Sequence, residues 1–209
     1  GDAGAEYDSH LTDMFEHSQH QHFVKELVLL YNKPSSIPKS VSGWFEHQQY
    51  FRHHHIIIED KRSTERFCRF LTGTAKALVL AGGGTRGWAH VGAMRAFSEI
   101  GLEFDLVGGT SAGSAAAALY ATGADYDYIS ATMDALMRAS LEVVKLRHYT
   151  LPIVSISDAS ANTLLLQTVF GETCIEQLER EFFCISCDIS GNREVVHDRG
   201  LLWQAVRAS

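Results

Sequence analysis

Two glycine-rich turns, each following a short apolar segment, constrain the fold of this chain more than any other feature. The first turn is the stretch 82–87, Gly-Gly-Gly-Thr-Arg-Gly, after the apolar segment 76–81. The second is the stretch 109–113, Gly-Thr-Ser-Ala-Gly, after the apolar segment 104–107. A helical pattern follows each turn. Strand, helix, strand and helix in this order predict a parallel sheet joined by right-handed crossovers.

The remaining chain continues the alternation of helical and extended patterns. Apolar and small residues at helical spacing predict helices over 66–71, 89–100, 114–122, 125–139, 159–170 and from 201 onward. Apolar runs bounded by turn residues predict a buried strand that ends at 31, and strands over 182–189 and 193–197. Residues 32–43 have linker composition, and the chain turns loop-like around Pro152. The fold class predicted is therefore α/β, with a mainly parallel sheet and helices on both of its faces.

Composition excludes several classes of protein. The 209 residues are 45% hydrophobic and 21% charged, as in ordinary globular domains. A formal charge of −7 disfavours a nucleic-acid-binding protein, because phosphate neutralisation requires a basic face. No apolar run approaches the roughly 18 to 20 residues of a membrane-spanning helix, and no signal peptide is visible. Four scattered cysteines do not make a disulfide scaffold, which favours a reducing, intracellular compartment.

The second turn predicts a nucleophile. A G-x-S-x-G turn between a strand and a helix holds its serine on a strained elbow, with the hydroxyl exposed at the carboxyl end of the sheet. Gly109 and Gly113 flank Ser111 because a side chain at either position would collide with neighbouring elements. Ser111 also stands at a predicted helix N-terminus, where free N–H groups stabilise negative charge. The alternative is a packing turn with an inert serine.

The first turn predicts an oxyanion hole. Three consecutive glycines, Gly82, Gly83 and Gly84, expose backbone N–H groups that can stabilise a tetrahedral oxyanion or bind a phosphate. The stretch also fits the dinucleotide fingerprint G-x-G-x-x-G, but that interpretation needs an acidic residue after the next strand and leaves the serine elbow unexplained. Both turns end successive parallel strands, so we expect the N–H groups of Gly83 and Gly84 to face a carbonyl oxygen attacked by Ser111.

These two turns resemble the signature of the patatin-like phospholipases, G-G-G-x-[RK]-G followed by G-x-S-x-G, with Arg86 and Gly87 completing the first motif. The chain resembles most closely the neuropathy target esterase branch, whose members are lysophospholipases. The segments 69–73, 107–111, 175–178, 188–190 and 202–209 carry this resemblance. It implies a patatin-like three-layer domain over residues 74–209, incomplete at its C-terminus, with residues 1–73 as lead-in and linker from a preceding region.

The resemblance also implies the activity, the site and the partners. It implies hydrolysis of (lyso)phospholipid esters through an acyl-enzyme on Ser111, with the N–H of Ala112 completing the oxyanion hole and with no metal or organic cofactor. The base implied is an aspartate in an Asp-Gly-Gly or Asp-Gly-Ala motif, which these residues do not contain, so we expect the chain alone to be inactive. Peripheral membrane contact and upstream cyclic-nucleotide-binding-like domains are further expectations from the same source.

Two other functions stay open. Ser111, Asp188 and His197 occur in the chain order of an α/β-hydrolase triad, which would keep the base inside the chain. A non-catalytic lipid- or phosphate-binding module built on the same turns is the second alternative.

Several smaller signals favour structural roles. The run 53–55, His-His-His, is interpreted as a polar surface run, since only alternate residues of a strand share a face. Cys184 and Cys187 have redox-motif spacing but lie on a predicted strand, where we expect opposite orientations and core packing. His90 is expected to pack or to cap a helix. Arg86 can steady the glycine turn, meet a lipid phosphate or pair with a carboxylate.

Overall fold

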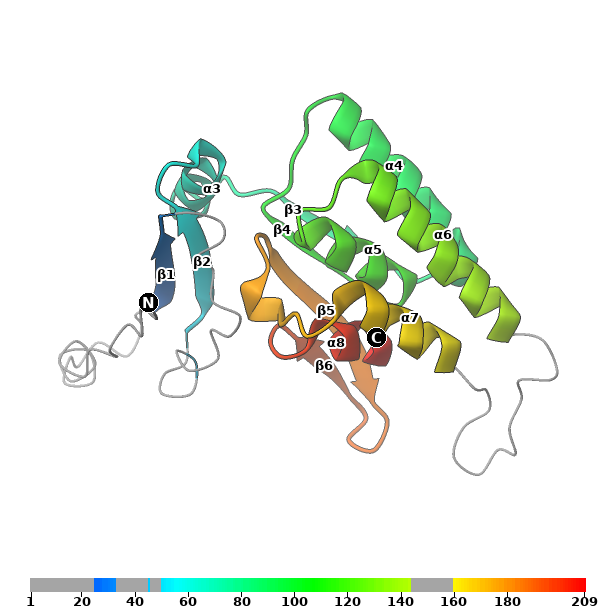
Figure 1. Ribbon diagram of the computed structural model, residues 1–209. Helices are drawn as coiled ribbons and strands as arrows, with labels where there is room; N and C mark the ends of the chain where they lie inside the picture. The colour runs from blue at the N-terminus through cyan, green and yellow to red at the C-terminus, as the bar shows by residue number, and fades with distance from the viewer. Residues whose placement is uncertain (1–24, 33–44, 46–49, 144–159) are drawn as a thin grey trace.

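A mainly parallel sheet forms the centre of the chain in the computed structural model, which describes residues 25–32, 45, 50–143 and 160–209 (Figure 1). The strands lie in the order β3-β4-β5-β6. The first three pair in parallel, and β6 pairs antiparallel with β5 through a hairpin. Their bounds are β3 Ala77–Leu80, β4 Leu106–Gly109, β5 Glu181–Asp188 and β6 Arg193–His197. The predicted α/β class with a mainly parallel sheet is confirmed.

Helices follow the strands as the periodicity predicts. Their bounds are η2 Gly84–Gly87, α4 Trp88–Glu99, α5 Ala112–Ala121, α6 Tyr126–Val143, α7 Ser160–Phe170, η4 Ile175–Gln177 and α8 Leu202–Ala208. The central helix is α5, which touches β3, β4 and β5. Its residues Ala116, Ala117 and Ala118 are fully buried, because methyl side chains let the helix lie close to the sheet.

Helices α4 to α8 lie on one face of this sheet. Consecutive right-handed crossovers that step in one direction along a sheet place their helices on the same side. Accordingly, α4, α5 and α6 contact one another, and α8 packs on α7, α5 and β5. On the other face, Val79 is 65% exposed and the ring of Phe183 fills the space beside Gly108. The second helical layer of the predicted three-layer fold is not seen in the described residues.

Some predicted boundaries move by a few residues. The strand predicted over 104–107 is β4, Leu106–Gly109, and therefore runs into the glycine turn. The helix predicted from 66 starts earlier, at Lys61, where the Asp60 carboxylate accepts hydrogen bonds from the N–H groups of Arg62 and Ser63. The predicted linker over 32–43 and the region around Pro152 lie almost entirely outside the described residues.

The N-terminal part forms a small unit beside the main sheet (Figure 1). It comprises β1 Glu26–Tyr31, β2 Arg52–Ile57 and α3 Lys61–Leu71, with β1 and β2 paired in parallel. The predicted strand at 26–31 is present, but only one face is buried, because Val28 and Leu30 are exposed while Leu29 and Tyr31 are not.

Ion pairs attach this unit to the amino ends of the main strands. Arg69 on α3 donates to both carboxylate oxygens of Asp105, which lies just before β4 and is 1% exposed. Burial raises the pKa of Asp105, but the guanidinium of Arg69 and the N–H of Lys76 outweigh it and hold the pKa below its ordinary value. Arg66 on the same helix donates to Glu179 at 3.1 Å.

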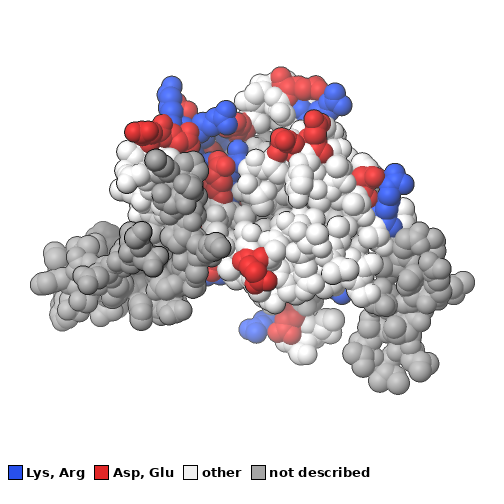
Figure 2. Space-filling view, in the orientation of Figure 1, with Lys and Arg blue, Asp and Glu red and all other residues white. Residues whose placement is uncertain are grey.

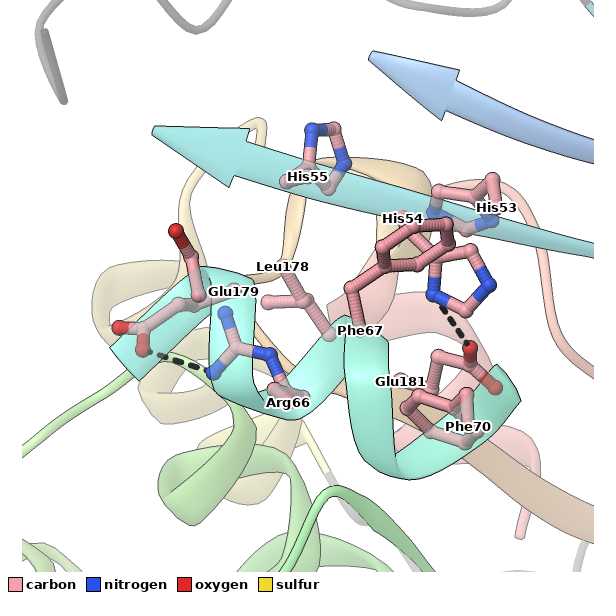
Figure 3. Close-up of a pocket in the computed structure, with 10 residues that line it drawn as sticks. His53, His54, His55, Arg66, Phe67, Phe70, Leu178, Glu179 and Glu181 are labelled. Atoms are coloured by element: carbon pink, nitrogen blue, oxygen red, sulfur yellow. Dashed lines mark hydrogen bonds and ion pairs between the residues drawn. The ribbon is translucent and has the colours of Figure 1, made fainter. Parts of the chain in front are cut away.

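A buried cluster of histidine and carboxylate groups lies at the same junction (Figure 3). His54 Nε2 donates to Glu26 at 3.0 Å, and its Nδ1 faces Glu181 Oε1 at 3.6 Å. His55 donates to the backbone carbonyl of Glu176 at 2.7 Å. His54 and His55 are each only 6% exposed, so the predicted polar surface run is wrong. These histidines are buried because groups distant in the sequence satisfy them.

Glu181, the first residue of β5, is the member of this cluster whose buried carboxyl group is least well compensated. Burial raises its pKa to about 7, and Arg52, whose Nε donates to Glu181 at 2.9 Å, offsets the rise only in part. The other carboxylate oxygen of Glu181 is buried without a hydrogen bond. Burial also lowers the pKa of His54, the imidazole that faces this carboxyl group.

This geometry predicts a pH-dependent contribution of Glu181 to stability. A carboxyl group whose pKa is higher in the folded state stabilises the fold below about pH 4.5 and loses that contribution as pH rises through about 7. We therefore expect the unfolding free energy of the wild type, relative to Glu181→Gln, to fall by about 2 to 3 kcal/mol between pH 5 and pH 8. Urea unfolding at both pH values measures this difference.

The matched control is Glu194→Gln, which changes an exposed carboxylate on β6. Its difference from the wild type should not vary with pH. A pH-independent difference for Glu181→Gln as well would contradict the assignment.

Candidate active site

The two glycine turns meet at the carboxyl ends of β3 and β4. The N–H of Gly82 donates to Thr110 Oγ1 at 2.9 Å, which ties the first turn to the residue before Ser111. A Cβ placed on Gly82 would lie 3.3 Å from the Cβ of Ser111. Parallel strands with aligned ends bring the turns together, as the register Leu80 to Gly109 shows.

Ser111 occupies the elbow between β4 and α5. Its φ is +52°, a region that residues with side chains rarely adopt. The residue is exposed, whereas the helix that begins at Ala112 is buried along most of its length. Ser111 therefore stands at the N-terminus of a ten-residue helix with its side chain accessible.

Close backbone packing explains why glycines flank Ser111. A Cβ on Gly113 would lie 2.2 Å from the carbonyl oxygen of Leu80, and one on Gly109 would lie 2.6 Å from the carbonyl carbon of Gly113. All of these neighbours are backbone atoms, which cannot rotate away. The glycines thus allow the first turn of α5 to lie against the end of β3, which brings the two turns together.

Backbone N–H groups around Ser111 are available to a ligand. The hydrogen bonds between loops, caps and turns in the described residues use none of the N–H groups of Gly83, Gly84 and Ala112. Gly84 has a φ of +55° and lines the same cavity as Ser111. A Cβ on Gly87 would lie 3.0 Å from the Cβ of Ala112, so the glycine turn also packs on the start of α5.

Two side chains from the turn itself and from the helix that follows it contact the backbone of the glycine turn. His90 Nε2 donates to the carbonyl of Ala81 at 2.7 Å, so His90 anchors the backbone just before the turn. The side chain of Arg86 lies over Gly83, where a Cβ would be 3.2 Å from the Arg86 Cβ. Within the described chain, Arg86 forms no ion pair with a carboxylate.

Two serines outside the two glycine motifs support the elbow. Ser209 Oγ accepts from the N–H of Ser111 at 3.0 Å and donates to the carbonyl of Ile185 at 2.8 Å. The buried Ser114 Oγ donates to the carbonyl of Ser111 at 2.6 Å. Small hydroxyl residues directly after a nucleophile turn are a signal that sequence reasoning can use for Ser114. Ser209 lies in the segment 202–209 that carries the family resemblance, but no local signal indicates its contact with Ser111, 98 positions away.

A cavity of about 390 Å³ opens beside Ser111. Helices α5, α6, α7 and α8 supply its walls, and Leu136, Met137 and Leu166 are among its apolar lining residues. Asn162 Nδ2 donates to Ser140 Oγ at 2.9 Å on the same wall. This volume lies in the range of small-molecule sites, which is roughly 300 to 1,000 Å³.

The residues of the alternative triad are not brought together. The Asp188 carboxylate accepts from the N–H groups of Ser190 and Gly191 and from Arg193, so it closes the β5–β6 turn. His197 Nε2 hydrogen-bonds with Ser186 Oγ at 2.7 Å. In the part of the chain that the structure describes, the Ser111 hydroxyl has no hydrogen bond to a carboxylate or an imidazole.

The two cysteines on β5 have the opposite orientations that the strand geometry predicts, but the predicted core packing holds only for Cys184 and is wrong for Cys187. Cys184 is fully buried in the core, and burial raises its pKa to about 12. Cys187 is exposed. Neither feature is that of a redox pair.

Among the described helices, none combines the length and the apolar character that crossing a membrane requires. Figure 2 shows that charged side chains gather toward the edges of the face in view, while the surface over α5 and α7 is mainly uncharged.

Comparison with known proteins agrees with this geometry. A sequence model of the family described as patatin-like phospholipase matches residues 78–209. Patatin-like phospholipase domain-containing protein 7 of Rattus norvegicus is 32% identical over 212 residues, covering 88% of this chain and 16% of the relative. Lysophospholipase nte1 of Aspergillus fumigatus is 37% identical over 156 residues, 71% of this chain and 10% of the relative. An uncharacterized NTE family protein of Mycobacterium tuberculosis is 39% identical over 142 residues, 68% of this chain and 24% of the relative.

The chain therefore spans a quarter or less of the length of each of these three relatives. The family match covers both glycine turns, the elbow and the helices that line the cavity. The chain belongs to the patatin-like phospholipase family, in its neuropathy target esterase branch.

Proposed function

We propose that this chain carries the nucleophile and the oxyanion hole of a serine hydrolase that cleaves carboxylic esters of phospholipids or lysophospholipids. The observation that carries the proposal is the junction of the two turns, where the exposed Ser111 lines one cavity together with Gly84 and Ala112. Among the described residues, no hydrogen bond between loops, caps and turns uses the N–H groups of Gly84, Ala112 or the neighbouring Gly83. The family and the name of the fungal relative, a lysophospholipase, support a lipid ester as substrate.

The proposed reaction begins with attack of Ser111 Oγ on the ester carbonyl carbon, while its proton passes to a general base. The carbonyl oxygen becomes an oxyanion, which the N–H groups of Gly83, Gly84 and Ala112 stabilise. Loss of one such donor typically costs about 3 to 4 kcal/mol of transition-state stabilisation. The intermediate expels the alcohol, which takes the proton from the base, and leaves an acyl-enzyme. Water attacks the acyl-enzyme, releases the fatty acid and returns the proton to Ser111.

The proposed base is the aspartate of an Asp-Gly-Gly or Asp-Gly-Ala motif, which these 209 residues do not contain. The absence of a hydrogen bond from Ser111 to any described carboxylate or imidazole supports this assignment. The same absence is the observation that favours the second candidate function, a non-catalytic lipid-binding module. Peripheral membrane contact belongs to both proposals.

The 209-residue chain alone is expected to hydrolyse a soluble fatty-acyl ester at or near the background rate, because a serine without a base is a poor nucleophile. A chain continued past Ser209 through the aspartate motif, termed the extended chain below, is expected to react with a fluorophosphonate at Ser111. Mass spectrometry of the labelled peptide locates the adduct.

Robust turnover by the 209-residue chain that Ser111→Ala abolishes would contradict the assignment of the base. An extended chain without a Ser111 adduct would favour the binding module over the hydrolase.

A further inference from the structure

The cavity beside Ser111 has mainly uncharged walls and a single charged side chain among its described lining residues. Its walls are mainly apolar or neutral, and they include Ala115, Leu136, Met137, Leu166 and Val206. Among the described residues that line it, Arg207 is the single charged one. A ligand that fills this cavity thus meets hydrocarbon surface along the walls and one guanidinium at the end of α8.

A hydrogen bond holds the side chain of Arg207, and no described carboxylate neutralises its charge. Its Nε donates to Thr163 Oγ1 on α7 at 2.8 Å, while the residue stays exposed. No carboxylate of the described residues pairs with it, in contrast to Arg66 and Arg69, which bind Glu179 and Asp105. Among the described residues, no group accepts a hydrogen bond from the two terminal nitrogens of the guanidinium. Their forked geometry matches the oxygens of a phosphate.

A hydrogen bond between the end of α8 and the elbow sets the position of Arg207 relative to the nucleophile. Arg207 precedes Ser209 by two residues, and Ser209 Oγ accepts from the N–H of Ser111 at 3.0 Å. Both Arg207 and Ser111 line the same cavity. In a glycerophospholipid the phosphate and the acyl ester are attached to the same glycerol unit. A group bound at Arg207 can thus be part of the molecule whose ester reaches Ser111.

We infer that Arg207 is a specificity-determining residue that binds the phosphate of an amphiphilic substrate while the apolar walls hold its acyl chain. The inference rests on the proposed function and adds to it the group that separates phospholipid esters from neutral esters. Arg86 is not used for this role, because its side chain lies over Gly83 and does not line the cavity.

The test is equilibrium binding to the 209-residue chain, which requires no general base. The ligands are a short-chain lysophosphatidylcholine that remains monomeric, the monoacylglycerol with the same acyl chain, glycerophosphocholine and inorganic phosphate. Arg207→Gln is expected to weaken lysophosphatidylcholine binding about tenfold or more and monoacylglycerol binding less than about twofold. Arg207→Lys, which keeps the charge but loses the fork, is expected to lie between. The control Arg62→Gln removes an equal charge from an exposed site on α3 and should change neither.

Unchanged monoacylglycerol binding also shows that the Arg207 variants are folded. Glycerophosphocholine and inorganic phosphate should bind far more weakly than the lysolipid, because they lack the acyl chain. The inference would be overturned if the Arg207 variants lost binding of both lipids equally or lost binding of neither. It would also be overturned if inorganic phosphate bound as tightly as the lysolipid, or if the wild type bound neither lipid. A different experiment tests the proposed hydrolase function, which would fail if the extended chain formed no fluorophosphonate adduct at Ser111.

Discussion

Ester hydrolysis by the extended chain is expected to fall about 10⁴- to 10⁶-fold when Ser111 is replaced by alanine, the range seen when a hydrolase loses its nucleophile. The side chain is exposed and the N–H of Ser111 is already bonded to Ser209, so the substitution removes only the hydroxyl. Folding should be unaffected. Initial rates with a soluble ester, together with thermal unfolding of both proteins, measure the effect.

Two variants serve as controls for this prediction. Ser186→Ala and His197→Ala each remove the hydrogen bond between Ser186 on β5 and His197 on β6. Both should keep fluorophosphonate labelling at Ser111 and most of the hydrolysis rate. Loss of activity in a His197→Ala protein that is still folded would support the alternative triad of Ser111, Asp188 and His197.

The second large effect is expected for Gly113→Ala. The added Cβ would lie 2.2 Å from the Leu80 carbonyl oxygen and 2.7 Å from that of Ala81, both of which are backbone atoms. Either α5 or the end of β3 has to shift, which we expect to cost about 3 kcal/mol of unfolding free energy. The shift also separates the two turns, so labelling of Ser111 in the extended chain should be strongly reduced. Urea unfolding and the rate of fluorophosphonate labelling report the two effects.

The matched control is Gly92→Ala on the exposed side of α4, where a Cβ would meet no atom within 4 Å. Alanine within a helix is expected to leave the fold unchanged or to stabilise it by about 0.5 to 1 kcal/mol. A Gly113→Ala protein as stable and as reactive as the wild type would show that the turns do not need this close approach.

The sequence predicted this part of the fold well because its determinants are local. Gly109, Ser111 and Gly113 form a turn that five consecutive residues identify, although the glycines are required by contacts with neighbouring backbone such as the Leu80 carbonyl. The alanines of α5 pack by size. The alternation that predicts β5 and β6 is local as well. These elements were recognised from a few consecutive residues, and the order of the elements then implied the parallel sheet.

Other features depend on partners distant in sequence and were not predictable in this way. The run 53–55 looks like a surface segment, yet His54 and His55 are buried against Glu26, Glu181 and the carbonyl of Glu176. The sequence predicts Asp105 within a strand, but Asp105 lies just before β4, where its carboxylate accepts a hydrogen bond from Arg69. The hydroxyl of Ser209 reaches Ser111 across 98 positions. Only coordinates reveal such contacts.

The central claim is that the two turns form one catalytic unit around Ser111. A crystal structure of the extended chain with a fluorophosphonate adduct tests it most directly, because the phosphoryl oxygen stands in for the oxyanion of the tetrahedral intermediate. The account predicts that this oxygen lies roughly 2.7 to 3.1 Å from the backbone nitrogens of Gly83 or Gly84 and of Ala112. An adduct on Ser111 whose oxygen points away from residues 83 and 84, or an adduct on another residue, would contradict it.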